Sequence, residues 1–388
     1  MLDRDKRHGN AYEAREPMSR GKRILSWIAV VVAVAAIALV LVTLVRLIFF
    51  RDRTTRISAN LLPCAASQDV TIMGDRVLYY DGSSIHCMGA AGGIQWSVPV
   101  GAGAQFSASD NGLVIWLGTD VYVVDGNGHT TYNASQDGAV QFARLSGNYC
   151  AIVYGEDTKP VLSVRNLDGG AVDSEREAYE GMLLLDVGFY GEADQYMWTL
   201  AMDVYGVTIN TVLNTFQVGK MNTGLVNLGE YLAYRVIYDN GTLRVYTTQQ
   251  MFSFNYKAVQ DMSGNQLVHG WQVIGVDYPQ RGNANILLAK SDQLNAAAGL
   301  SELRVMTGQT DRRFDIPSLS VGAVVYNGSI YAVSGSQIYH TGINRQQFYS
   351  HQIPLPEGMT VTGLIGVTSG GRIIVACGDS VYSVTLPR

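Results

Sequence analysis

Apolar and polar positions along most of this chain alternate in short runs that come in pairs, each pair joined by a tight turn. The first run is apolar, and the second opens with Ile or Val followed by Tyr or His. The clearest copies of this hairpin are Val77–His86, Val114–Tyr122, Ile330–Tyr339 and Ile373–Tyr382. Alternation with a period of two predicts half-buried β-strands, and glycine supplies the positive φ of tight turns. The chain is therefore expected to be all-β and built from repeated hairpins.

The hairpin recurs at a nearly constant period. Its turns are expected near Gly82, Gly118, Gly155, Asp203, Gly241, Lys290, Gly335 and Gly378. Successive turns are about 42 residues apart, close to the ~40–50 residues of one propeller blade. The predicted fold class is an all-β β-propeller of eight four-stranded blades, or of seven if two weak units merge. The alternatives are a pair of sandwich-like β-domains and a parallel β-solenoid, which hairpins with long outer loops disfavour.

Each unit has room for four strands. Those of the first unit, from the innermost outwards, are expected at Asp69–Ile72, Val77–Tyr80, Ile85–Met88 and Ile94–Pro99. The last unit has only three apolar runs from Val361 onwards. The segment Ile57–Leu62, which precedes the first unit, is expected to supply the missing outer strand. Closure by both ends of the chain would leave only short strand edges exposed.

An uncharged segment of 19 residues, Trp27–Val45, precedes the β-region. A helix of ~20 residues spans a hydrocarbon core of ~30 Å. A cleavable signal peptide would have a shorter apolar run followed by small residues, whereas Phe49, Phe50 and Arg51 follow here. The sequence thus predicts a cytoplasmic basic tail at residues 1–23, an uncleaved transmembrane helix at 24–46, a linker at 47–56 and the propeller at 57–388.

The orientation of this predicted span does not follow from charge alone. Four basic residues precede the span and four follow it: Arg15, Arg20, Lys22 and Arg23, then Arg46, Arg51, Arg53 and Arg56. The positive-inside rule is therefore undecided. A single span followed by a large β-domain favours a cell-membrane protein with its N-terminus in the cytoplasm and its propeller outside.

Charge divides sharply between the two regions. Residues 1–56 contain 11 Lys/Arg and 5 Asp/Glu, a net charge of +6. The remaining residues hold 28 − 11 = 17 basic and 33 − 5 = 28 acidic residues, a net charge of −11. An acidic β-domain without basic runs is a poor nucleic-acid binder. No nucleic-acid partner is expected.

One segment carries a resemblance to a known repeat. Met88–Val100 is similar to the turn between the third and outer strands of PQQ-like propeller repeats, and Gly93-Ile-Gln-Trp96 matches their Gly-x-x-Trp. Val123–Gly128 and Asn166–Gly170 look like degenerate versions. The layout also resembles an uncharacterised bacterial family with a basic tail, one membrane span and a PQQ-like propeller outside. This resemblance implies the fold and no particular activity.

No motif predicts catalytic, cofactor-binding or metal-binding residues. PQQ dehydrogenases, the enzymatic relatives that the resemblance implies, often have adjacent cysteines and a tryptophan repeated in each blade. Here no two cysteines are adjacent, and Trp96 alone matches the motif tryptophan. None of the six histidines forms a ligand pair. Asp125-Gly-Asn-Gly-His129 lacks the later ligands of a calcium loop. Ser107–Trp116 has the wrong spacing for a sialidase box, so Asp110–Gly112 is expected to be a turn.

The four cysteines, Cys64, Cys87, Cys150 and Cys377, are far apart in sequence. If Ile57–Leu62 completes the last blade, Cys64 lies near Cys377, and a disulfide between them would lock the ring. Cys87 and Cys150 are expected to be free and buried.

Two functions are compatible with the sequence. The first is a non-enzymatic binding or scaffolding module, tethered to the membrane, whose rigid loop face binds a protein or cell-envelope component. The second is an enzyme that acts on envelope carbohydrate or a small molecule at the propeller axis. Clustered Asp, Glu or His at the axis would favour the enzyme, and an apolar or plugged axis with an exposed aromatic patch would favour binding.

Overall fold

The computed structural model describes residues 31–42, 57–220, 224–294, 299–308 and 310–387. Residues 31–42, which lie within the predicted membrane span, form an α-helix. The remainder of that predicted span lies outside the described residues. Among the described residues, no helix is long and apolar enough to span a membrane. The β-region forms a separate compact unit, Thr55–Pro387.

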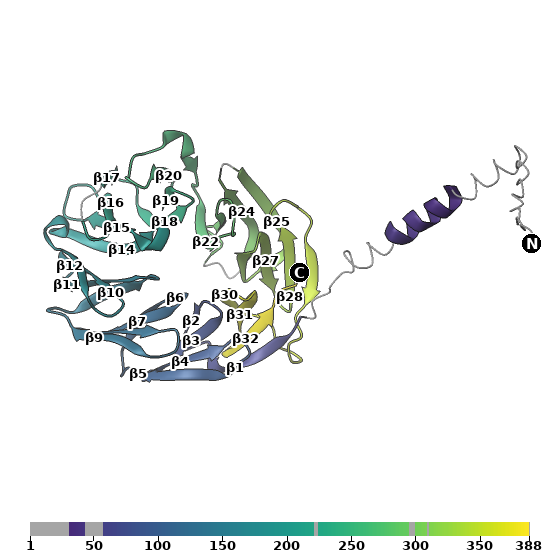
Figure 1. Ribbon diagram of the computed structural model, residues 1–388, viewed down its shortest axis with the longest axis horizontal. Helices are drawn as coiled ribbons and strands as arrows, with labels where there is room; N and C mark the ends of the chain where they lie inside the picture. Colours follow the sequence, from purple (N-terminus) through teal and green to yellow (C-terminus); the bar gives the residue numbers. More distant parts are fainter. Residues whose placement is uncertain (1–30, 43–56, 221–223, 295–298, 309, 388) are drawn as a thin grey trace, which may run out of the picture. The chain divides into compact units, whose positions relative to one another are not determined.

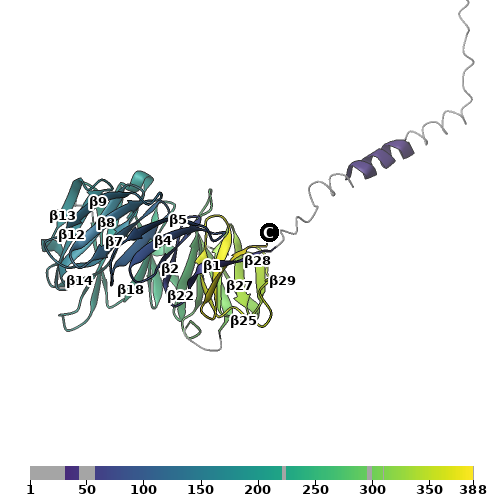
Figure 2. The same cartoon turned by 90° about the horizontal axis from the view of Figure 1, so that it is seen from below.

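This unit is a ring of sheets arranged like the blades of a propeller (Figures 1 and 2). Its described residues form eight four-stranded antiparallel sheets, each an up-and-down meander, so the prediction of eight four-stranded blades is confirmed. The blades are numbered here in chain order. Three short 3₁₀ helices, η1 (Glu177–Tyr179), η2 (Glu192–Asp194) and η3 (Met262–Gly264), lie in the loops.

From the innermost strand outwards, the first four blades have these members. Blade 1 consists of β2 (Asp69–Met73), β3 (Arg76–Tyr80), β4 (Ser84–Gly89) and β5 (Ile94–Pro99). Blade 2 consists of β6 (Gln105–Ser109), β7 (Gly112–Leu117), β8 (Asp120–Asp125) and β9 (Thr130–Ser135). Blade 3 consists of β10 (Val140–Leu145), β11 (Tyr149–Glu156), β12 (Lys159–Asn166) and β13 (Ala171–Glu175). Blade 4 consists of β14 (Met182–Tyr190), β15 (Tyr196–Asp203), β16 (Asn210–Gln217) and β17 (Gly224–Gly229).

The last four blades follow the same plan. Blade 5 consists of β18 (Ala233–Asp239), β19 (Thr242–Thr247), β20 (Gln250–Asn255) and β21 (Gln266–Leu267). Blade 6 consists of β22 (Trp271–Asp277), β23 (Asn285–Lys290), β24 (Leu300–Thr307) and β25 (Thr310–Ser320). Blade 7 consists of β26 (Gly322–Tyr326), β27 (Ser329–Ser334), β28 (Gln337–Gly342) and β29 (Tyr349–Gln352). Blade 8 consists of β30 (Gly363–Val367), β31 (Arg372–Cys377), β32 (Ser380–Thr385) and β1 (Ala59–Ala65).

Both faces of the blades are buried, which explains the nearly continuous apolar runs of the middle strands. In β7, Leu113 and Ile115 pack into the core between blades 1 and 2, whereas Val114 and Trp116 pack into the core between blades 2 and 3. Alternate residues of a strand point to opposite faces, so each blade contributes to two cores. The ring is therefore held by a series of cores between neighbouring blades.

The two ends of the β-region meet in blade 8, as the sequence predicted. Ala59 pairs with Val384 and Leu61 with Tyr382, which makes β1 the outer strand of the last sheet. The backbone N–H of Ser58 also donates to Oγ1 of Thr385 at 2.7 Å. Leu62 is buried in the core that blade 8 shares with blade 1.

The expected Cys64–Cys377 disulfide is not present, because both thiols are free. The reason lies in the strand order: β32 lies between β1, which carries Cys64, and β31, which carries Cys377. Strands two places apart are separated by about 9.6 Å, whereas bridged cysteines need Cα atoms within about 7 Å. Burial raises the pKa of Cys64 to about 11, so this thiol stays protonated at neutral pH.

The turn predicted near Gly241 is present, but it joins a different pair of strands in its blade than the turns at Gly82 and Gly118 do. Asn240 and Gly241 join β18 to β19, so they form the first turn of blade 5 instead of its second. The second turn, Thr248–Gln249, has no glycine. There the Thr247 hydroxyl oxygen accepts hydrogen bonds from the backbone N–H groups of Gln249 and Gln250.

The meander gives the ring two distinct faces. One face, here called the connection face, carries the turns between second and third strands and the connections from each blade to the next. The opposite face, here called the entry face, carries the other turns within each blade. The first residues of β1 pair with the last residues of β32, so the chain enters the ring at the rim of the entry face.

Candidate functional site

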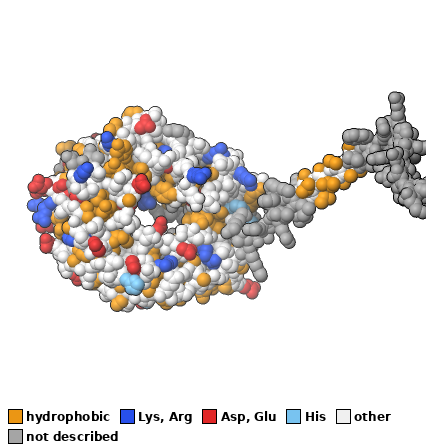
Figure 3. All heavy atoms as spheres, viewed as in Figure 1, with side chains coloured by type: hydrophobic (Ala, Val, Ile, Leu, Met, Phe, Trp, Pro, Cys, Tyr) orange, Lys and Arg blue, Asp and Glu red, His pale blue; other side chains and the backbone are white. Residues whose placement is uncertain are grey.

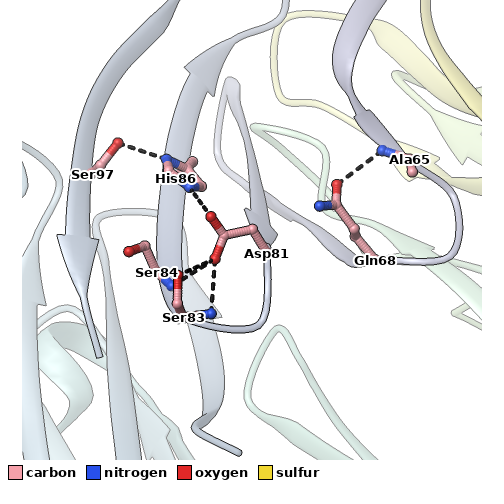
Figure 4. A network of polar contacts seen from close by, with 7 residues as sticks. All are labelled: Ala65, Gln68, Asp81, Ser83, Ser84, His86 and Ser97. Atoms are coloured by element: carbon pink, nitrogen blue, oxygen red, sulfur yellow. Dashed lines mark hydrogen bonds and ion pairs between the residues drawn. The ribbon is translucent and has the colours of Figure 1, made fainter. Parts of the chain in front are cut away.

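A polar network in blade 1 joins three side chains whose types often carry catalysis (Figure 4). Asp81 lies in the β3–β4 turn, His86 on β4 and Ser97 on the outer strand β5. The Asp81 carboxylate contacts Nε2 of His86 at 2.8 Å, and Nδ1 of His86 lies 2.7 Å from the Ser97 hydroxyl oxygen. His86 also stacks on Tyr79 at 4.7 Å between ring centroids. The sequence predicted only a turn and an ordinary strand histidine here.

The local sequence explains how Asp81 is held. Its Oδ1 accepts hydrogen bonds from the backbone N–H groups of Ser83 and Ser84 and from the Ser83 hydroxyl. The hydrogen bond from His86, followed by those from Ser84 and Ser83, holds the pKa of the Asp81 carboxyl well below its usual range. Asp81 thus remains an anion that fixes the turn and the orientation of the imidazole.

The chemistry of this network is better explained by structure than by catalysis. Acyl transfer needs preorganised donors for an oxyanion as well as a serine, a base and a carboxylate. The contacts at Asp81, His86 and Ser97 instead tie the β3–β4 turn, the third strand and the outer strand together. We therefore assign the network to the stability of blade 1.

A pair of histidines lies in the outer half of blade 7. His340 on β28 and His351 on β29 have ring centroids 4.9 Å apart, and His340 stacks on Tyr331 of β27. Nδ1 of His340 and Nε2 of His351 are buried without a hydrogen-bond partner among the described residues. Burial, and then the neighbouring His351, lower the pKa of His340. Within the described residues, no three His, Cys, Asp or Glu side chains gather to hold a metal ion.

Charged residues also lie at the axis of the ring. Figure 3 shows an opening at its centre with acidic and basic side chains around it. On the inner strands of blades 3 and 4, Nε of Arg144 donates to the Asp186 carboxylate at 2.9 Å. This ion pair joins neighbouring inner strands. Arg144 and Asp186, two charged residues near the axis, are therefore paired with each other.

A pocket of about 740 Å³ opens on the connection face at blade 3. Three segments line it: residues 137–139 before β10, residues around the β11–β12 turn, and Arg176, Glu177 and Glu180 before β14. Its volume lies within the range of ligand-binding pockets, about 300–1,000 Å³. Because the three segments are separated along the chain by strands of blade 3, they form a pocket only when that blade is folded.

Acidic groups predominate around this pocket. Its lining contains four carboxylates, Asp137, Glu156, Glu177 and Glu180, and two cations, Lys159 and Arg176. Among the described ion pairs, only one joins two of these groups, that of Lys159 with Glu180 at 3.9 Å, and both of its side chains are exposed. An exposed pair at this distance is weak. The pocket is thus accessible, bordered by charged groups and of net negative charge.

An apolar turn lies beside the pocket on the same face. Residues 204–209 join β15 to β16, and Tyr205, Val207 and Ile209 are 67%, 106% and 53% exposed. Asp203 pairs with Met182, so this turn begins where the connection that carries Glu180 ends. Such exposed apolar groups, gathered in one turn, are typical of an interaction site.

Neither of the two segments that the sequence analysis tested for a calcium loop or a sialidase box belongs to this surface. Asp125-Gly-Asn-Gly-His129 is a turn, in which Oδ1 of Asp125 accepts hydrogen bonds from the backbone N–H groups of Asn127 and His129. Asp110–Gly112 also forms the expected turn, between β6 and β7. Sequence reasoning missed the pocket, although the charged run Glu175–Glu177 and the apolar turn Val204–Ile209 are visible signals.

Comparisons with known proteins give fold-level likenesses only. No protein-family profile and no curated protein matches this sequence. Among solved structures, the chain is similar to apo AztD from Citrobacter koseri (TM-score 0.49, 9% identity, 83% of this chain and 95% of that one). It is also similar to BamB from Moraxella catarrhalis (TM-score 0.48, 9% identity, 85% and 96%). A third is the Pan2 WD40 domain of Neurospora crassa (TM-score 0.43, 11% identity, 82% and 89%).

Proposed function

We propose that this protein is a membrane-tethered, extracytoplasmic β-propeller that acts as a non-enzymatic binding or scaffolding module for a protein or cell-envelope component. The observation that carries the proposal is the connection face, where the pocket and the apolar turn 204–209 lie side by side. Rigid strands hold both features, as is common for binding loops.

The strand topology supports this use of the connection face. The chain enters the ring at the rim of the entry face, next to Ser58 and Ala59. The connection face is therefore the face of the ring opposite to the point where the chain enters the β-region. The apolar run Trp27–Val45 and the acidic composition of residues 57–388 support the tether and a propeller that stays apart from polyanions.

Binding is favoured over the alternative of an axial enzyme. The one chain of serine, histidine and carboxylate described here is built into blade 1, and Arg144 and Asp186 at the inner strands are paired with each other. The exposed apolar turn has no corresponding role within the ring. Its burial against a partner would remove apolar surface from water.

The orientation is tested by cysteine labelling with a membrane-impermeant reagent. Gln346→Cys lies on an exposed loop of blade 7, and Ser19→Cys lies in the basic tail. Cys87, Cys150 and Cys377 are buried and give a low background. Labelling of Gln346→Cys in intact cells, with Ser19→Cys labelled only after lysis, is expected. The reverse pattern would contradict an extracytoplasmic propeller.

The binding role is tested with a photo-crosslinking amino acid in the full-length protein. We expect discrete adducts from position Val207, on the connection face, in intact cells. Asn111, an exposed residue of the β6–β7 turn on the entry face, is the matched control position. Equal adducts at both positions, or none at Val207, would contradict the proposal.

A further inference from the structure

We infer that the connection face over blades 3 to 5 binds a protein segment in which basic side chains lie next to apolar ones. This inference rests on the proposed binding function and names the partner's chemistry. The pocket would take the basic side chains, and the apolar turn 204–209 would take their apolar neighbours.

The pocket is preorganised by hydrogen bonds between its walls. The backbone N–H of Gly155 donates to the Ala139 carbonyl at 2.9 Å, which joins the β11–β12 hairpin to the segment before β10. The backbone N–H of Gly181 donates to the Thr158 carbonyl at 2.8 Å, which joins the same hairpin to the segment before β14. All three lining segments are thus fixed to one another before any partner arrives, which limits the entropy lost on binding.

Two glycines allow this close approach of the walls. A Cβ atom on Gly138 would lie 3.0 Å from Cα of Gly155, which is tighter than nine in ten real Cβ contacts. Gly155 has a φ of +102°, which L-residues with a side chain rarely adopt. The shape of the pocket therefore depends on residues that contribute no side chain to it.

The lining matches a Lys or Arg side chain. Tyr154 and Val161 supply apolar and aromatic surface for the methylene stem of a long basic side chain. Asp137, Glu156 and Glu177 supply carboxylates that have no described ion-pair partner. Arg176 and Lys159 leave a net charge of −2 from four carboxylates and two cations. The wider region 57–388, with its net charge of −11, adds long-range attraction for a basic partner.

The apolar part of the surface lies within reach of the same segment. It consists of Tyr205, Val207 and Ile209, continued by Leu232 (43% exposed) in the connection between blades 4 and 5. Met182 pairs with Asp203. The turn that follows Asp203 therefore begins next to Glu180 and Gly181, the residues that precede Met182. An extended chain of about six residues covers roughly 20 Å, enough to contact both parts.

A protein segment fits this surface better than a lipid membrane does. An anionic membrane surface would be repelled by the carboxylates around the pocket. A second copy of the ring would bring the same negative charge to the interface, so the two copies would repel each other. The walls, moreover, enclose a pocket that accepts individual side chains.

The test uses full-length protein in neutral-lipid nanodiscs and three fluorescent peptides of equal length. One peptide alternates Lys or Arg with Leu, one alternates Glu with Leu, and one alternates Lys with Ser. We expect the first to bind at least about tenfold more tightly than the other two, and more weakly as salt is added. Equal binding of all three would overturn the inference.

Variants locate the binding site. Glu177→Lys with Glu180→Lys is expected to weaken the basic–apolar peptide by about tenfold or more, and Val207→Ser by a few-fold. Glu192→Lys, an equally exposed charge reversal in blade 4 on the entry face, is the matched control and should change nothing. Equal loss in all variants, or in none, would overturn the inference. Thermal unfolding of each variant confirms that the ring is intact.

Other occupants are distinguished by separate measurements. Binding to anionic vesicles, or self-association in sedimentation, that is lost in Val207→Ser would replace the protein segment with a membrane or a second copy, and would overturn the inference. If Val207 forms adducts in cells that persist with Glu177→Lys and Glu180→Lys, the binding function stands and the proposed partner chemistry fails.

Discussion

The indole nitrogen of Trp96, on the outer strand of blade 1, donates a hydrogen bond to the carbonyl oxygen of Gly126 in blade 2, at 3.0 Å. Trp96 is the tryptophan of the Gly-x-x-Trp resemblance, so its position accounts for that motif in structural terms. The third residue of the next two outer strands acts in the same way. Tyr132 packs on Gly169 of blade 3, and the Asp173 carboxylate accepts a hydrogen bond from the backbone N–H of Gly219 in blade 4.

This contact predicts an unusually sensitive glycine. A Cβ atom on Gly128 would lie 2.7 Å from Cγ of Trp96, and its φ is +86°. We expect Gly128→Ala to reduce the free energy of unfolding by about 2–5 kcal/mol, from backbone strain and from displacement of the indole. Gly241→Ala is the matched control, since Gly241 has a φ of +85° and open space around it. It should lose only about 1–2 kcal/mol in urea unfolding. Equal losses of stability in Gly128→Ala and Gly241→Ala would show that the Trp96 indole moves aside without an energetic cost.

Two buried tyrosines should respond oppositely to loss of their hydroxyl groups. The Tyr246 hydroxyl is buried without a described partner, whereas that of Tyr179 lies 2.8 Å from the Thr199 hydroxyl. Tyr246→Phe is expected to leave stability unchanged or raise it by about 1 kcal/mol, and Tyr179→Phe to lower it by about 1 kcal/mol. Chemical denaturation measures both. A clear loss in Tyr246→Phe would show that its hydroxyl is satisfied, for example by a buried water.

A buried ion pair within blade 5, hydrogen-bonded to blade 6, is expected to be critical. Arg244 contacts Asp239 at 2.9 Å with both side chains buried, and Asp239 also accepts a hydrogen bond from the backbone N–H of Ala284. Asp239→Ala should lower stability by about 3–5 kcal/mol, because it leaves a buried guanidinium uncompensated. Lys159→Ala, which removes the exposed partner of Glu180, is the control and should change it by less than about 1 kcal/mol. A small effect of Asp239→Ala would mean that water reaches Arg244.

Stability should fall in mild acid because of the histidine pair in blade 7. Burial and then His351 lower the pKa of His340 in the folded ring, so above the ordinary histidine pKa of about 6.5 the imidazole is neutral in both states. As pH falls below that value, the unfolded chain takes up a proton that the folded ring resists, and stability is lost. The groups that face His340 are Tyr331, Tyr349 and His351.

The measurement compares melting temperatures of the protein and of His340→Phe between pH 7.5 and pH 5. The phenyl ring keeps the stacking on Tyr331 and removes the titration. We therefore expect a shallower pH dependence in His340→Phe. A parallel decline in both proteins would assign the acid sensitivity to other groups.

Much of the fold followed from the sequence because both faces of each middle strand are buried. This made the hairpins visible as apolar runs with turns between them, as in Val114–Tyr122. The exception in blade 5 arose because Asn240-Gly241 is a strong hairpin signal, whereas the turn after Thr247 depends on a threonine hydroxyl. The expected disulfide is absent because placing two cysteines in the same blade does not specify how many strands lie between them.

The site was largely invisible to sequence reasoning, since its parts meet only through strand pairing and the packing of loops in the folded ring. His86 and Ser97 are 11 residues apart and become neighbours through the pairing of β4 with β5. The pocket combines Asp137, Glu156 and Glu177 from three separate segments. Local patterns indicate that each segment is a turn or connection, but they do not indicate which of them share a wall.

Pairing of the first strand with the last has a consequence for biosynthesis. Ala59 pairs with Val384, 384 − 59 = 325 residues later in the chain. At translation rates of about 5–20 residues per second, β1 waits roughly 16–65 s for its partner. During that interval blade 1 and its successors can form in order, but the exposed edge of β1 is open to strands of other chains. Nascent chains on the same polysome would therefore risk exchanging their first strands. Wider spacing of the ribosomes, or protection of β1 by a chaperone during synthesis, would favour monomeric rings.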